Sequence, residues 1–370
     1  MRKIALVTST RAEYGIMSRL IEALSNDSEV DFYLLVTGAH LSKKFGETKN
    51  EISQPIYEEI DIQIEKDPAH SLSLAVLKFS EILKKIKPDL LVLLGDRYEI
   101  MGVGTACMLN NIPIAHIGGG DSTGGIDEAI RHAITKMSHL HFTTCESSKK
   151  RVIQLGENPN RVFNVGSLAV ENMKHIKLLS KDELEKSLNF KLNKKNLLVT
   201  FHPVTLEGNE RAQFSELLAA FDELKNTNII ITCPNSDSGN DEIFALINSY
   251  KKTHKNVSVH SSLGMRRYFS CMRFVDIIVG NSSSGIYEAP SFKKPTINIG
   301  SRQNGRVQAD SIINCKPFKN DILNAINAAY KKDCSTTTNP YEKQGTMQNI
   351  KNIIKNYDLN HIIKKEFYLL

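Results

Sequence analysis

The sequence has neither the hydrophobic runs of a membrane protein nor the cysteine pattern of a metal site or a disulfide framework. No apolar stretch approaches the roughly 18 residues that a membrane-spanning helix needs. The six cysteines are scattered along 370 residues without a C-x-x-C pair, which indicates reduced thiols in the cytoplasm and no metal ion. The first apolar run, residues 3–8, leads into charged Arg11 and Glu13, so it predicts a buried strand instead of a signal peptide.

Signals for nucleic-acid binding and for dinucleotide or P-loop chemistry are also missing. The net charge of +6 comes from lysines that are mixed with acids, without the basic stripes and interleaved aromatic residues of a nucleic-acid partner. No G-x-G-x-x-G follows the first apolar run, and no glycine-rich loop ends in Gly-Lys-Ser/Thr. These absences argue against a dehydrogenase and a P-loop enzyme, whereas the modest positive charge suits a small anionic ligand.

What the sequence does contain is a series of short apolar runs that alternate with helical segments. Runs without polar alternation are typical of parallel strands covered on both faces. The expected strands are residues 3–8, 31–37, 89–95, 112–117, 140–144 and 162–166 in the first half, and 197–201, 228–233, 257–260, 275–280 and 295–300 in the second. The sequence therefore predicts an α/β protein with two Rossmann-like, doubly wound parallel sheets.

A lysine-rich stretch without strand pattern, residues 180–196, separates the two series. We expect an N-terminal domain over 1–175 and a C-terminal domain over 176–345, which are ordinary domain sizes. The last segment, 346–370, has apolar residues at helical spacing and is expected to pack back on the first domain. Two domains imply a ligand cleft between them.

Ligands of open parallel sheets bind beyond the carboxyl ends of the strands, so the residues after each run are candidates for the site. In T-S-T-R-A-E-Y-G, Arg11 either binds an anion at a helix N-terminus or belongs to an ordinary helix start with Glu13 in its first turn. In G-D-R-Y-E, Asp96 is placed for proton transfer beside Arg97, and a salt bridge that caps the helix is the alternative.

The strongest local signal is H-I-G-G-G-D-S-T-G-G-I-D-E-A-I-R-H, residues 116–132. Five glycines within ten residues let the backbone approach a ligand closely, although such loops are often only turns. Asp121, Asp127 and Glu128 bring three carboxylates to this loop and the helix after it. Three histidines that lack the geometry of a ligand cluster are expected in the core or behind the site: His132, His139 and His141.

In the second half, His202 ends a strand in T-F-H-P-V-T, where a histidine stabilises negative charge or moves a proton. The string G-N-S-S-S-G-I-Y-E-A-P ends another strand and opens a helix. Its N–H groups and serines would hold a diphosphate and its glutamate a ribose diol, while a serine-capped helix is the alternative. The nucleotide-binding candidates of this half are Asn235, Ser282, Ser283, Gly285, Glu288 and Arg302.

Taken in order, these strings resemble the hydrolysing UDP-N-acetylglucosamine 2-epimerases of sialic acid and related nonulosonic acid biosynthesis. The resemblance is carried by TRAEYG, VTGAHLS, LGDRYEI, IDEAIRHAITKMSHLHF, RVFNVGS, VTFHPVT, GNSSSGIYE and NIGSRQNGR, which cover nearly the entire chain. It implies a GT-B-like fold with the active site between the two domains, a UDP-sugar substrate, no cofactor and a homodimer.

The resemblance also implies a mechanism. In such enzymes a base removes the C2 proton of the sugar while the nucleoside diphosphate leaves C1, and water then adds to the 2-acetamidoglucal. By resemblance, Asp96, Asp121 and Asp127 are the acid/base candidates, and His202 steadies charge on the leaving phosphate. The residues implied in nucleotide binding are Arg11, Arg97, Asn235, Ser282, Ser283, Gly285, Glu288 and Arg302.

Gly118 and Asp121 depart from the family pattern, because some relatives carry glutamate at these positions. The departure indicates an altered sugar pocket, and our hypothesis is a 4-acetamido-6-deoxy sugar, UDP-N,N'-diacetylbacillosamine, as in legionaminic acid pathways. Two other functions stay open. A GT-B glycosyltransferase needs the same nucleotide site together with an acceptor, and a nucleotide-sugar-binding regulator needs the site without catalysis.

Overall fold

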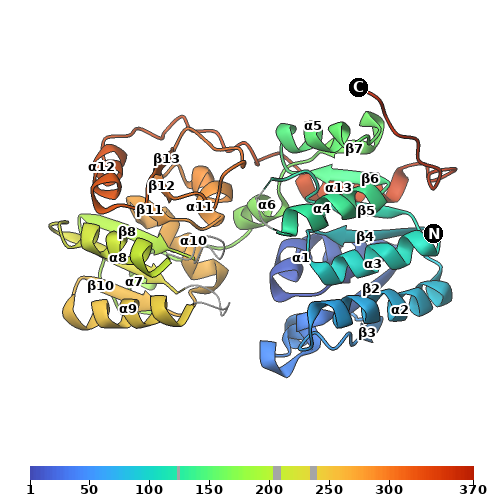
Figure 1. Cartoon of the computed structure of the whole chain (residues 1–370), viewed down its shortest axis with the longest axis horizontal. Coiled ribbons are helices and arrows are strands. Elements are labelled where there is room, and N and C mark those ends of the chain that lie inside the picture. Colours follow the sequence, from blue (N-terminus) through green and yellow to red (C-terminus); the bar gives the residue numbers. More distant parts are fainter. Residues whose placement is uncertain (123–125, 203–209, 234–239) are drawn as a thin grey trace. The chain divides into compact units, whose positions relative to one another are not determined.

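The computed structural model describes residues 1–122, 126–202, 210–233 and 240–370, which divide into two units (Figure 1). Unit 1 comprises Met1–Asn172 and Lys343–Leu370, and unit 2 comprises Met173–Glu342. Each unit is built around one parallel sheet that has helices on both faces. The prediction of two doubly wound α/β domains is therefore confirmed.

In the described part of unit 1, seven parallel strands form a sheet in the order β3-β2-β1-β4-β5-β6-β7. The strands are β1 (Arg2–Thr8), β2 (Val30–Thr37), β3 (Glu58–Ile60), β4 (Leu90–Leu94), β5 (Ile114–Ile117), β6 (Leu140–Thr143) and β7 (Val162–Asn164). The helices are α1 (Arg11–Ser25), α2 (Pro68–Ile86), α3 (Tyr98–Leu109), α4 (Ile126–Met137), α5 (Glu146–Gln154), α6 (Leu168–Lys174) and α13 (Thr346–Asn356), with 3-10 turns η1 (Gly38–Leu41), η2 (Lys43–Phe45), η3 (Thr48–Glu51) and η4 (Pro159–Arg161).

The described residues of unit 2 contribute six parallel strands in the order β10-β9-β8-β11-β12-β13. These are β8 (Lys195–Thr200), β9 (Thr227–Thr232), β10 (Val257–His260), β11 (Ile277–Gly280), β12 (Thr296–Ile299) and β13 (Ile312–Cys315). The helices are α7 (Lys181–Leu188), α8 (Glu210–Phe221), α9 (Asn240–Thr253), α10 (Gly264–Phe274), α11 (Ser284–Tyr287) and α12 (Lys319–Ala329), with the 3-10 turn η5 (Ala289–Phe292). No helix among the described residues is long and apolar enough to cross a membrane.

The unbroken apolar runs of the central strands follow from burial on both faces. Along β1, Ile4 and Leu6 pack on one face with side chains of α1 and α13, whereas Ala5 and Val7 pack on the other with α2 and α3. The same alternation recurs in unit 2, where β8 divides its residues between one core with α8, α9 and α12 and another with α7 and α10. Successive side chains of a strand point to opposite faces, so such a strand is apolar throughout.

Two short edge strands, β3 and β13, were not predicted from the sequence. Strand β3 reads Glu-Glu-Ile with only its last residue buried, and the residues of β13 are half-buried or exposed. An edge strand is partly solvated and therefore lacks the continuous apolar run that marks the central strands. These two strands were missed for this reason, whereas the opposite edge strands, β7 and β10, were predicted.

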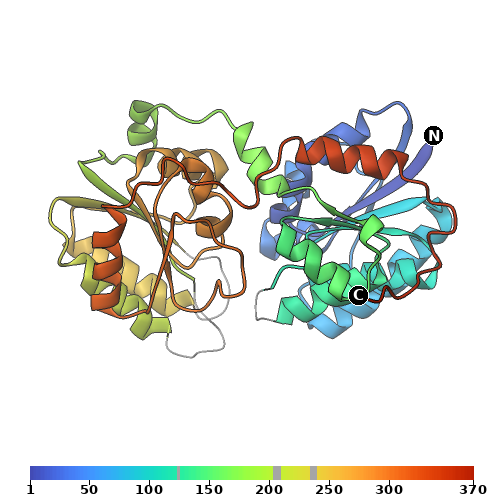
Figure 2. The ribbon, with the colours of Figure 1, turned by 90° about the horizontal axis from the view of Figure 1, so that it is seen from above.

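The chain returns to unit 1 for its last helix, α13, which lies on the same face of the sheet as α1 (Figure 2). Ile350 and Ile354 are fully buried in that core. The guanidinium Nη1 of Arg2 donates to the backbone oxygen of Ile354 over 2.8 Å, and Lys351 pairs with Asp27 over 2.9 Å. The C-terminal segment is thus part of the first core.

We expect Ile354→Ala to destabilise unit 1 by about 2–5 kcal/mol, because it leaves a cavity between α13 and the sheet. Asn352→Ala, on the exposed side of the same helix, is the matched control and should change stability by no more than about 0.5 kcal/mol. Urea denaturation, with amide hydrogen exchange of β1 and β2 to identify the unit that opens, measures both. Equal stabilities of the two variants would contradict this packing.

Candidate functional site

The sheet order of each unit fixes where a ligand site can form. In unit 1 the chain runs outward from β1 to β2 in one direction and from β4 to β5 in the other, so the order reverses between β1 and β4. In unit 2 the same reversal lies between β8 and β11. Open parallel sheets bind ligands in the crevice that such a reversal creates at the carboxyl ends of the strands. The loops after these four strands therefore carry the candidates.

In unit 1, Arg131 of α4 connects the two loops that hold Asp96 and Asp121. Its Nη2 forms an ion pair with Asp96 Oδ2, and its Nη1 donates to the backbone oxygen of Asp121 over 2.7 Å. The Arg131 side chain is only 5% exposed, and a buried guanidinium is stable only with an anionic partner and satisfied hydrogen bonds. Arg131 consequently holds the Asp96 side chain in place by an ion pair.

Asp121 is held by hydroxyl groups at the start of α5. Its Oδ1 accepts hydrogen bonds from Thr144 Oγ1 at 3.1 Å and Ser148 Oγ at 2.6 Å. The preceding Gly120 has a φ of +82°, and a Cβ there would lie 2.3 Å from the Ser148 backbone oxygen. Arg151 donates to the Gly120 carbonyl. The glycine at this position is thus required by both conformation and space, and it lets the loop place Asp121 against α5.

The other acids of the glycine-rich string lie at the start of α4. Asp127 is exposed in the first turn of α4, one helical turn before Arg131. Glu128 accepts a hydrogen bond from Ser122 Oγ at 3.0 Å and lies 3.6 Å from His132 Nε2. Residues 123–125, between the two acidic ends of this loop, lie outside the described residues.

His116 supports the loop that carries Asp96. Its Nε2 donates to the Gly95 backbone oxygen over 2.8 Å, so in the neutral ring Nδ1 accepts from Thr135 Oγ1 at 3.2 Å. Complete burial lowers the pKa of His116 to about 3, so the ring is neutral at physiological pH. The neutral ring connects β5 to α4 and to the loop after β4 by these two hydrogen bonds.

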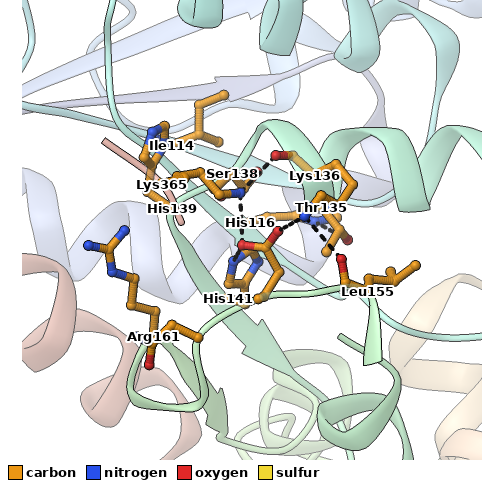
Figure 3. Close-up of polar contacts among 12 residues, drawn as sticks. Ile114, His116, Thr135, Lys136, Ser138, His139, His141, Leu155, Arg161 and Lys365 are labelled. Carbon is orange, nitrogen blue, oxygen red and sulfur yellow. Dashed lines mark hydrogen bonds and ion pairs between the residues drawn. The ribbon is translucent and has the colours of Figure 1, made fainter. Parts of the chain in front are cut away.

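His139 and His141 lie away from the carboxyl edge, at the start of β6. The Glu157 carboxylate pairs with His141, Lys136 and Lys365 at 3.0, 2.6 and 2.7 Å. Figure 3 shows these three side chains converging from different segments. Although burial opposes it, these hydrogen bonds lower the pKa of Glu157 to about 2. His139 Nδ1 accepts from the Ile114 amide at 3.2 Å. Both histidines are part of the core, and His141 shares the Glu157 carboxylate with Lys365 of the C-terminal segment.

The two arginines predicted to bind the nucleotide are at the starts of α1 and α3. Arg11 is exposed, and its nearest acid is Glu51 at 3.9 Å. Arg97 precedes α3, and its Nε donates to Glu99 Oε1 over 2.5 Å while the side chain stays 45% exposed. Both therefore present guanidinium groups to solvent near the reversal of the sheet.

In unit 2, Asn281 fixes the position of His202. Asn281 Oδ1 accepts from the His202 amide at 2.7 Å, and its Nδ2 donates to the His202 carbonyl over 2.8 Å. Arg302 Nη1 and Gln303 Nε2 in turn donate to the Asn281 carbonyl over 3.0 and 2.7 Å. One buried amide thus joins the loop after β8 to the loop after β11 and to Arg302.

The strand before this amide ends in Gly280. A Cβ at Gly280, whose φ is +136°, would lie 2.0 Å from the Thr200 backbone oxygen. Only glycine allows β11 to approach the end of β8 so closely, and that approach is what brings Asn281 within reach of His202.

The serine string opens the short helix α11. Ser282 and Ser283 are half-buried, and Gly285 packs with its Cα against Thr296 of β12, where a Cβ would be 3.0 Å from Cγ2. Glu288 ends this helix, and its buried Oε2 has no hydrogen-bond partner among the described residues. Burial raises the pKa of Glu288 to about 8. Asn235 lies outside the described residues.

The structure therefore brings the predicted residues together in two groups, Asp96 with Asp121 in unit 1 and His202 with Arg302 in unit 2. Sequence reasoning missed the side chains that hold them, namely Arg131, His116 and Asn281. The spacing of Asp127 and Arg131, four residues apart on one helix face, was the available signal for Arg131. In the part of the chain that the structure describes, no group of His, Cys, Asp or Glu side chains could hold a metal ion.

Comparison with known proteins agrees with this arrangement. Residues 22–355 match the family model described as UDP-N-acetylglucosamine 2-epimerase. The chain belongs to the UDP-N-acetylglucosamine 2-epimerase family. This membership confirms the family to which the sequence motifs pointed.

Individual relatives of this epimerase family cover nearly the entire chain. A GDP/UDP-N,N'-diacetylbacillosamine 2-epimerase (hydrolyzing) of Campylobacter jejuni is 41% identical over 99% of this chain and 98% of its own. A polysialic acid biosynthesis protein, P7, of Escherichia coli is 40% identical over 96% and 94%. The crystal structure of UDP-GlcNAc 2-epimerase from Neisseria meningitidis bound to UDP-GlcNAc has a TM-score of 0.78 at 19% identity, over 96% of this chain and 100% of that one, and shows the same fold.

The free energy of unfolding of the wild type should fall as the pH rises, in part because Glu288 becomes ionised. We expect Glu288→Gln to lack this part of the decrease. The folded state keeps the Glu288 proton up to about pH 8, whereas the unfolded state releases it above its ordinary pKa of 4.5. The stabilisation by that proton is complete below pH 4.5 and is lost as the pH rises towards 8.

Thermal unfolding between about pH 5 and about pH 8.5 measures this difference. The wild type should lose melting temperature relative to Glu288→Gln across that range. Glu242→Gln, which removes an exposed carboxylate of the same unit, should follow the wild type. A Glu288→Gln profile parallel to the wild type would show that Glu288 is ionised in the folded chain.

Proposed function

We propose that the protein is a hydrolysing UDP-sugar 2-epimerase. It converts UDP-N-acetylglucosamine, or the 4-acetamido-6-deoxy analogue UDP-N,N'-diacetylbacillosamine, into the free 2-epimeric manno sugar and UDP. The observation that carries the proposal is the Asp96–Arg131–Asp121 arrangement at the strand-order reversal of unit 1, in a chain of the UDP-N-acetylglucosamine 2-epimerase family.

The reaction needs acid/base groups and no redox chemistry. A carboxylate takes the proton from C2, the C1–O bond breaks with its electron pair on the departing UDP, and a C1=C2 double bond remains. Water then adds, with OH at C1 and a proton at C2 on the opposite face. We assign the proton transfers to Asp96, Asp121 and Asp127, of which Asp96, as the ionised partner of Arg131, is our candidate for the C2 base.

Unit 2 supplies the nucleotide contacts in this proposal. His202, which Asn281 holds by two hydrogen bonds, would donate to the leaving phosphate. Ser282, Ser283 and the Arg302 guanidinium would bind the diphosphate. Glu288 would accept from the ribose hydroxyls, and in unit 1 Arg11 and Arg97 would add positive charge. The further nucleotide-binding residues in the proposal are Asn235 and Gly285.

Two observations favour the diacetylated sugar as substrate. The Campylobacter relative at 41% identity is named for N,N'-diacetylbacillosamine. Gly118, where some family members carry glutamate, has a φ of +85°, and a Cβ there would meet no described heavy atom within 4 Å. The space that a larger side chain would occupy at the end of β5 is thus open to a 4-acetamido group.

The proposal extends to the setting of the enzyme. All six cysteines are free, which fits a reducing cytoplasm, and the E. coli relative is named for polysialic acid biosynthesis. These two observations support our proposal that the reaction belongs to the cytoplasmic synthesis of sialic or legionaminic acid. The proposal of a homodimer rests on the family resemblance alone. Light scattering of the purified chain determines its oligomeric state.

Incubation with each UDP-sugar alone in deuterium oxide tests the reaction. We expect release of UDP together with a free manno sugar that carries deuterium at C2, and a higher kcat/KM for UDP-N,N'-diacetylbacillosamine than for UDP-N-acetylglucosamine. A glycosyltransferase would release UDP only when an acceptor is added, and a regulator would bind without turnover. A strong preference for UDP-N-acetylglucosamine would contradict the substrate assignment while leaving the reaction intact.

Asp96→Asn should lower kcat by about 10²–10⁴-fold, the usual contribution of a general acid or base. Arg131→Gln should lower kcat by a similar factor, because it removes the ion-pair partner of Asp96. Asp61→Asn, which removes an exposed acid of the same unit, is the control and should keep wild-type kcat and KM. Full activity of Asp96→Asn would remove Asp96 from the chemistry.

A further inference from the structure

Two buried carboxylates at the carboxyl edge of unit 1, Glu13 and Glu99, have no part in the reaction proposed above. Glu13 is 7% exposed and Glu99 is fully buried. One oxygen of each, Glu13 Oε1 and Glu99 Oε2, has no hydrogen-bond partner among the described residues. Burying a charged carboxylate is costly unless a cation lies beside it. The protonation states of Glu13 and Glu99 therefore need a physical explanation.

Ser9, directly after β1, lies between the two acids. Its Oγ is 2.9 Å from Glu13 Oε2 and 3.0 Å from Glu99 Oε1, and its amide donates to Glu13 Oε2 over 2.8 Å. A serine hydroxyl has one proton and can donate to only one of the two oxygens. The other short contact needs a second proton, which a carboxylic acid supplies.

Arg97 determines which acid carries that proton. Its Nε donates to Glu99 Oε1 over 2.5 Å, and a guanidinium favours the ionised form of the carboxylate that it contacts. We therefore assign the extra proton to Glu13, the carboxyl group that does not contact the guanidinium. The hydrogen bonds then run in one direction, from the Glu13 carboxyl to the Ser9 hydroxyl and from that hydroxyl to Glu99.

Other charged groups near α1 leave this arrangement unchanged. His40 of η1 lies beside Tyr14, and burial lowers its pKa to about 4, so it is neutral. Arg11 and Glu51 of η3 face each other at 3.9 Å on the exposed side. The charges that face Glu13 are those of Glu99 and Arg97, and burial raises the pKa of Glu13 to about 7 against the hydrogen bond from the Ser9 amide.

We propose that Glu13, Ser9 and Glu99 share one proton and together position Arg97. Loss of this proton then weakens the binding of a phosphate ligand to Arg97. Glu99 orients the guanidinium, and the proton on Glu13 keeps a second negative charge away from it. The identity of the ligand as a nucleoside diphosphate rests on the proposed function, whereas the shared proton does not.

Protonation of Glu13 and binding of a phosphate ligand affect each other reciprocally. If protonation of Glu13 strengthens phosphate binding, then phosphate binding must strengthen protonation of Glu13. Near pH 7, where Glu13 is partly ionised, binding of UDP therefore takes up protons. As the pH rises through this range, Glu13 loses its proton and the affinity for UDP falls.

Isothermal titration calorimetry with UDP, in buffers of different ionisation enthalpy, measures both quantities. From about pH 6 to about pH 8.5 the wild-type Kd should rise at least about fivefold more than that of Glu13→Gln, the lower end of such coupling. Proton uptake near pH 7 should be smaller in Glu13→Gln. Titration of the UDP phosphate is common to all variants and cancels in the comparison.

Glu22→Gln, which changes an exposed acid on the same helix, is the matched control and should behave like the wild type. Identical pH dependence and proton uptake in the wild type and Glu13→Gln would overturn the coupling to Arg97.

Infrared difference spectroscopy of the unliganded protein tests the shared proton by itself. In a Glu288→Gln background, which removes the other described carboxyl group whose pKa burial raises, a buried carboxylic acid band should disappear as the pH rises through about 7. Glu13→Gln should lack this band. Absence of a titrating band in the background variant would overturn the proposal even if Glu13→Gln does not fold.

The two measurements separate this proposal from the proposed function. A chain that binds no UDP but shows the titrating Glu13 band would refute the nucleotide-sugar function and keep the shared proton. A chain that turns over UDP-sugar but shows no titrating band would support the proposed function and refute the shared proton.

Discussion

The buried guanidinium of Arg131 is the constraint on which the geometry of unit 1 depends. Its two ends reach the loop after β4 and the loop after β5, so the carboxylate of Asp96 and the backbone at Asp121 are held by a single side chain. A buried cation tolerates little displacement of its partners, because an unpaired charge in a low dielectric is costly. His116 connects β5 to the loop after β4 and, through Thr135, to α4 without adding charge.

Unit 2 reaches a comparable result with neutral groups. There the connecting side chain is the amide of Asn281, which both donates to and accepts from the His202 backbone. This pairing is possible only because Gly280 lets β11 approach β8 closely.

The central strands and the positions of Asp96 and His202 could be predicted from the sequence, because burial on both faces leaves apolar runs and ligands bind where those runs end. The edge strands β3 and β13 could not, since solvation breaks their pattern. Arg131, Asn281 and Glu99 were also missed. Their importance comes from contacts with residues 35, 79 and 90 positions away. Separations of that size leave no local signal for Asn281 and Glu99, and the only local signal for Arg131 was its spacing from Asp127.

Four of the acids at the carboxyl edges add little negative charge, which suits an anionic ligand. Asp96 and Glu99 are each neutralised by an arginine, while burial raises the pKa of Glu13 to about 7 and that of Glu288 to about 8. A carboxyl group that keeps its proton can form hydrogen bonds without repelling a diphosphate. Burial thus lets each unit keep a protonated acid at the carboxyl edge of its sheet, where it adds no negative charge.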